Sequence, residues 1–94
     1  MINTYKLLTG KTELTMVNGD YTIEAREEDG KLSIMISYVD IDDETTLKVK
    51  KHIDIKNPLN EYFDELEKLF EAFTPRKFPL VLLLENIIGV LNEL

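Results

Sequence analysis

The chain has 94 residues, enough for one hydrophobic core, and its 44% hydrophobic and 31% charged residues are typical of a folded globular domain. It has no cysteine, which excludes disulfides, thiolate chemistry and cysteine-based metal sites and favours a reducing compartment. The net charge of −7 disfavours direct binding to nucleic acid or to anionic membranes, and no secretory segment opens the sequence. We therefore expect a cytoplasmic protein with a protein partner that has a basic surface.

Two glycine-containing pairs predict two successive β-hairpins. Asn-Gly and Asp-Gly tolerate the positive φ that both central positions of a type I′ turn require. Turns centred on Asn18-Gly19 and Asp29-Gly30 give three antiparallel strands with one apolar and one polar face. These registers place apolar side chains in two rows that cross the three strands: Leu14, Ile23 and Ile36, and then Met16, Tyr21 and Tyr38.

A further strand is predicted from Leu47 to Ile55, where apolar and polar residues alternate. Lys51 interrupts the apolar row, which indicates an edge strand whose ammonium group reaches water. The segment from Tyr5 to Leu8 is also β-like and would add a fifth strand. The register of the strand at 47–55 stays open, because the connection at 40–45 is irregular.

After Ile55 the apolar period changes from two to 3.6, which predicts helices. Asn57-Pro58 is typical of a helix start, and Thr74-Pro75 ends the pattern. The apolar side chains cover an arc of about 120°, as expected for a helix with one side on a sheet. These apolar residues are Leu59, Tyr62, Phe63, Leu66, Leu69, Phe70 and Phe73, and the acidic residues on the remaining arc are Glu61, Asp64, Glu65, Glu67 and Glu71.

A second helix is predicted from Pro79 to the C-terminus, with apolar residues over about 180° of its circumference. An arc of that width implies contact on two sides. The second contact is either the first helix or a surface outside the monomer, which would be a homodimer seam or a partner groove centred on Val81, Leu82 and Ile88. A membrane span needs about 20 apolar residues, and this segment is shorter and contains acids, so we expect no membrane insertion.

These elements predict one α+β domain over residues 1–94. Residues 1–56 form an antiparallel β-meander of four strands, or five with the N-terminal segment, and residues 57–94 form a helical pair packed on one face of the sheet.

The sequence contains no motif that indicates a catalytic or metal-binding site. The acidic run at 40–44 resembles the start of a calcium loop, but Thr45 stands where that loop needs glycine and Lys51 where it needs glutamate. His52 is the only histidine, on the polar side of an edge strand, and Ser37 on the neighbouring strand would lie near it. No third catalytic group accompanies them, so we expect no enzyme activity, no cofactor and no metal.

Charge is the remaining functional signal. The first helix carries an acidic face, whereas lysines make the 47–56 segment basic: Lys48, Lys50, Lys51 and Lys56. We interpret the chain as a non-catalytic protein-binding module, such as an inhibitor, immunity or adaptor protein of the kind that phages and other mobile elements encode. Two alternatives stay open, a protein that binds or sequesters a small molecule or nucleotide, and a homo-oligomeric assembly protein.

Overall fold

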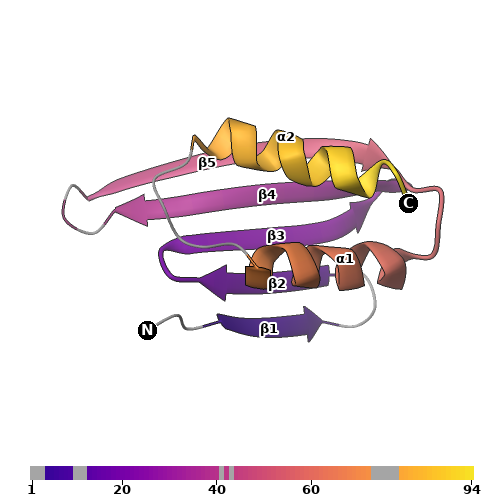
Figure 1. Ribbon diagram of the computed structural model, residues 1–94, viewed down its shortest axis with the longest axis horizontal. Coiled ribbons are helices and arrows are strands. Elements are labelled where there is room, and N and C mark those ends of the chain that lie inside the picture. Colours follow the sequence, from indigo (N-terminus) through magenta and orange to yellow (C-terminus); the bar gives the residue numbers. More distant parts are fainter. Residues whose placement is uncertain (1–3, 10–12, 41, 43, 73–78) are drawn as a thin grey trace.

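The computed structural model describes residues 4–9, 13–40, 42, 44–72 and 79–94. One antiparallel sheet contains five strands in chain order: β1 (Thr4–Thr9), β2 (Glu13–Asn18), β3 (Tyr21–Glu28), β4 (Lys31–Asp40) and β5 (Thr45–Asp54). Two helices follow, α1 (Leu59–Ala72) and α2 (Leu80–Leu91). Figure 1 shows both helices on the same face of the sheet, α1 over β2 and α2 over β4 and β5. The predicted α+β meander with two C-terminal helices on one face is confirmed, and the N-terminal strand is part of the sheet.

The second hairpin has the predicted turn. Asp29 and Gly30 both have positive φ, 51° and 79°, as the central residues of a type I′ turn do. The register that follows pairs β3 with β4 as expected, so Tyr21 lies opposite Tyr38 and their rings are 4.9 Å apart.

The predicted register of the first hairpin is wrong by two residues. Met16 lies opposite Ile23, and Asn18 lies opposite Tyr21, so the turn consists of Gly19 and Asp20. Gly19 has a φ of 62°, whereas Asp20 does not have positive φ, which fits a type II′ turn with glycine at its first central position. A shift of two residues keeps each side chain on its predicted face.

Asn18 explains why the strand continues past the predicted turn. Its side chain is fully buried, and its Nδ2 donates a hydrogen bond of 2.9 Å to the backbone carbonyl of Phe70 in the last turn of α1. The final carbonyls of a helix have no partner within the helix. Asn18 therefore satisfies one of them and joins β2 to α1.

The core lies between the sheet and the two helices. α1 buries Tyr62, Phe63, Leu66 and Phe70, and α2 buries Leu80, Leu84, Ile87 and Leu91. Among the described side chains of the sheet, the core contains those of β2, β3 and β4, with one from β5: Leu14, Met16, Tyr21, Ile23, Ala25, Leu32, Ile34, Ile36 and Ile53. At the β5–α1 connection, the backbone N–H of Lys56 donates to the hydroxyl of buried Tyr62 at 3.0 Å.

Both helices follow the sequence periodicity closely. α1 begins one residue after the predicted Pro58, and α2 ends at Leu91, three residues before the last residue of the chain. The predicted apolar position Phe73 and the predicted helix end at Thr74-Pro75 lie outside the described residues. Neither helix in the described part of the chain is long and apolar enough to cross a bilayer.

Candidate functional site

The outward face of α1 carries the acidic residues that the sequence predicts, but it does not present all of them equally. Glu61, Asp64 and Glu71 are exposed, whereas Glu65 and Glu67 are half-buried. On a helix with 3.6 residues per turn, Glu65 and Glu67 lie about 160° apart, on opposite flanks. The solvent-exposed part of the predicted acidic face is therefore formed by Glu61, Asp64 and Glu71.

Four charged residues on one flank of α1 surround a shallow hollow. Asp64, Glu67, Lys68 and Glu71 line it, and its volume is about 270 Å³. Their spacing of three and four residues places them on consecutive turns of one helix face. Three carboxylates therefore share this hollow with a single ammonium group, that of Lys68.

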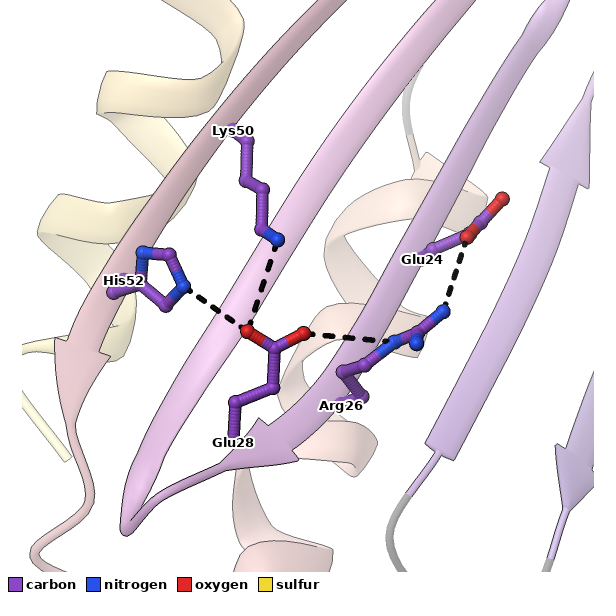
Figure 2. A network of polar contacts seen from close by, with 5 residues as sticks. All are labelled: Glu24, Arg26, Glu28, Lys50 and His52. Atoms are coloured by element: carbon purple, nitrogen blue, oxygen red, sulfur yellow. Dashed lines mark hydrogen bonds and ion pairs between the residues drawn. The ribbon is translucent and has the colours of Figure 1, made fainter.

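The sheet face that the helices leave uncovered carries a second charged group of side chains. Figure 2 shows the carboxylates of Glu24 and Glu28 beside three basic side chains, those of Arg26, Lys50 and His52, above β3, β4 and β5. Glu28 is at the centre. Its carboxylate oxygens lie 3.3 Å from Nε2 of His52, 3.7 Å from Nζ of Lys50 and 4.0 Å from Nε of Arg26.

These contacts stabilise the charged form of Glu28. The hydrogen bond from His52, followed by the positive charge of Lys50, lowers the pKa of Glu28 below its ordinary value of 4.5. The predicted position of His52 on the polar face of an edge strand is confirmed, whereas its contact with Glu28 is not predicted from the sequence. That pairing depends on the β4–β5 register, which the irregular 40–45 connection hides from the sequence.

His52 does not assemble a nucleophile site in the described residues. Its partner across the strand pair is Ser33, not Ser37 as predicted, because Ser37 lies opposite Lys48. Ser33 is only 3% exposed, so a substrate does not reach it in this structure. A catalytic base has to contact the group that it deprotonates, and no hydrogen bond joins Ser33 to His52 among the side chains described.

The three residues of the apolar partner site predicted on α2 differ in their exposure to solvent. Val81 and Leu82 are 52% and 49% exposed. Ile88 is half-buried and packs against the core. Two adjacent apolar side chains near the start of α2 are therefore open to solvent.

No group of three or more His, Cys, Asp or Glu residues within the described ranges could hold a metal ion. The acidic run at 40–44 is covered only in part, because residues 41 and 43 lie outside those ranges. No protein-family model, curated protein or solved structure matches the chain.

Proposed function

We propose that this chain is a non-catalytic protein-binding module, an inhibitor, immunity or adaptor protein, which acts in the cytoplasm and engages a basic surface of its partner through α1. The observation that carries the proposal is the hollow on the outward face of α1, where Asp64, Glu67 and Glu71 surround about 270 Å³ with Lys68 beside them. A protein whose net charge is −7 gains solubility from any exposed acid. Three carboxylates around one hollow would, beyond this general effect, make a specific contact with a cationic side chain of a partner.

The hollow suits a lysine or arginine side chain of the partner. A carboxylate that accepts a hydrogen bond from an ammonium or guanidinium group makes one of the stronger hydrogen bonds in proteins. The surrounding negative charge would also speed the encounter with a basic surface, and this effect weakens as ionic strength rises. Binding through α1 should therefore depend strongly on salt.

The test is affinity capture from the native host with two matched variants. The first neutralises α1 through Glu61→Gln, Asp64→Asn, Glu67→Gln and Glu71→Gln. The control removes the same number of charges from exposed acids elsewhere, through Glu13→Gln, Asp20→Asn, Glu27→Gln and Glu93→Gln. Circular dichroism first establishes that both variants are folded.

We expect the unmodified chain and the control variant to capture a protein with a basic surface. The α1 variant should not capture this protein, and added salt should release it. Mass spectrometry with quantification at about 0.05 M and about 0.3 M salt gives these comparisons, since screening shortens from more than 10 Å to less than 8 Å over that range. A partner that the α1 variant retains fully, or that high salt leaves bound, would contradict the proposal.

A homo-oligomer through α2 is the second candidate, because Val81 and Leu82 stay exposed. Sedimentation velocity tests it directly. A monomer at high concentration would remove this candidate, whereas a dimer that the double variant Val81→Ser and Leu82→Ser dissociates would support it.

A further inference from the structure

β5 forms one edge of the sheet. It pairs with β4 along all ten of its residues, and no other described strand pairs with its outer side. The loop and turn hydrogen bonds of the described backbone do not involve residues 46–54 of β5 either. An edge strand of this kind presents unpaired N–H and C=O groups that can accept a further strand.

The charge of this edge is opposite to that of the whole protein. β5 carries Lys48, Lys50 and Lys51 against a single acid, Asp54, in a chain whose net charge is −7. Lys50 and Lys51 contact Glu28 and Glu85, each at 3.7 Å. Pairs as exposed as these contribute little, so the lysines stay available to a partner.

The helix side of the edge exposes two apolar side chains. Leu47 of β5 is 53% exposed, and Val81 of α2 is 52% exposed. Val81 precedes Glu85 by four residues, and Glu85 contacts Lys51 of β5, so Val81 lies on the flank of α2 that faces this edge. The edge is therefore basic on the uncovered sheet face, where Lys48 and Lys50 lie, whereas its helix face combines exposed Leu47 and Val81 with the ion pair between Lys51 and Glu85.

The charges also decide which occupant the edge fits. An antiparallel pair of two β5 strands would bring Lys48 and Lys50 of both copies onto one sheet face, and like charges directly opposite each other on adjacent strands are destabilising. An acidic strand meets the same lysines with opposite charge. We propose that the outer edge of β5 binds an extended acidic segment of another protein as an additional strand, with acidic residues at alternate positions and apolar residues between them.

This docking edge is independent of the proposed function of α1. In Figure 1, β5 lies at the edge of the sheet away from β1 and β2, and α1 packs on β2. Strand addition of this kind takes its affinity from main-chain hydrogen bonds and its specificity from alternate side chains. Acids opposite Lys48 and Lys50 would select the partner, and apolar side chains would contact Leu47 and Val81.

The experiment adds three synthetic peptides to the full chain and follows backbone amides by NMR and hydrogen exchange. The first peptide alternates Glu and Val, the second alternates Lys and Val, and the third is the Glu–Val peptide with every amide N-methylated. We expect the first peptide to slow exchange in β5, and the Lys–Val peptide to bind at least about tenfold more weakly. N-methylation should abolish the protection, because it removes the backbone donors that a strand needs.

A variant of the chain provides the second comparison. Lys48→Glu should weaken binding of the Glu–Val peptide at least about threefold, whereas Lys56→Glu changes the net charge equally outside β5 and should bind almost normally. Four results would overturn the inference: unchanged β5 exchange, equal binding of the two unmodified peptides, full binding of the N-methylated peptide, or equal losses in the two variants.

Discussion

The hydrogen bond between Asn18 and α1 gives the sharpest test of how the helices are attached to the sheet. Replacement of Asn18 by alanine removes the Nδ2 donor, which lies 2.9 Å from the carbonyl of Phe70. Asn18 is fully buried, so water does not replace the lost donor without rearrangement. An unsatisfied buried polar group costs about 1–3 kcal/mol. We therefore expect Asn18→Ala to lower the free energy of unfolding by about 1–3 kcal/mol, and Tm by roughly 4–8 °C for each kcal/mol.

Asn86→Ala is the matched control, because the same atoms are removed from an exposed position in the middle of α2. Alanine has the higher helix propensity, so this variant should be unchanged or more stable by a few tenths of a kcal/mol. Urea denaturation, followed by circular dichroism, measures both differences. Equal stability of the two variants would refute the view that the Asn18 bond joins β2 to α1.

Four further predictions concern the charge network and the glycines. Glu28→Gln should destabilise the protein at pH 7, and this effect should disappear as pH falls. The pKa of Glu28 is lower in the folded than in the unfolded chain, so its carboxylate stabilises the fold above the pKa of the unfolded chain, and this stability is lost as the folded protein becomes protonated at Glu28. The carboxyl titration of Glu28 by NMR should have a midpoint below 4.5 that returns toward 4.5 in His52→Ala, and an unchanged midpoint would contradict the contact. Gly89→Ala should stabilise α2 by about 1 kcal/mol, since a Cβ there meets open space, and urea denaturation checks it. Gly30→Ala should cost about 1–2 kcal/mol in the same assay, because Gly30 has a φ of 79°.

The two hairpins show where local sequence is sufficient and where it is not. Asp29-Gly30 forms the expected turn, in which both residues are exposed and adopt positive φ. At the first hairpin, Asn18 is a good turn residue by itself, but its hydrogen bond to Phe70, 52 residues away, keeps it in the strand. The predicted apolar and polar faces are still correct despite the wrong register, because a shift of two residues leaves each side chain on the same face.

The candidate sites also differ in whether local sequence is sufficient to predict them. Helical periodicity alone places Glu61, Asp64 and Glu71 on the outward face of α1, and the structure exposes all three. The contact between Glu28 and His52 joins residues 24 apart through β4, which lies between β3 and β5. Its prediction would require the β4–β5 register, and no turn signal in the 40–44 connection fixes that register from sequence.

The most direct measurement for the acidic face of α1 is site-specific photo-crosslinking in a native extract. The chain has no cysteine, so a single introduced cysteine carries the crosslinker at one defined position. Glu71→Cys places it at the hollow on α1, and Glu27→Cys places it at an exposed acid on β3. We predict a crosslink to one basic protein from position 71, weakened by salt, and none to that protein from position 27. Equal crosslinking from both positions, or a product at position 27 alone, would contradict binding through α1.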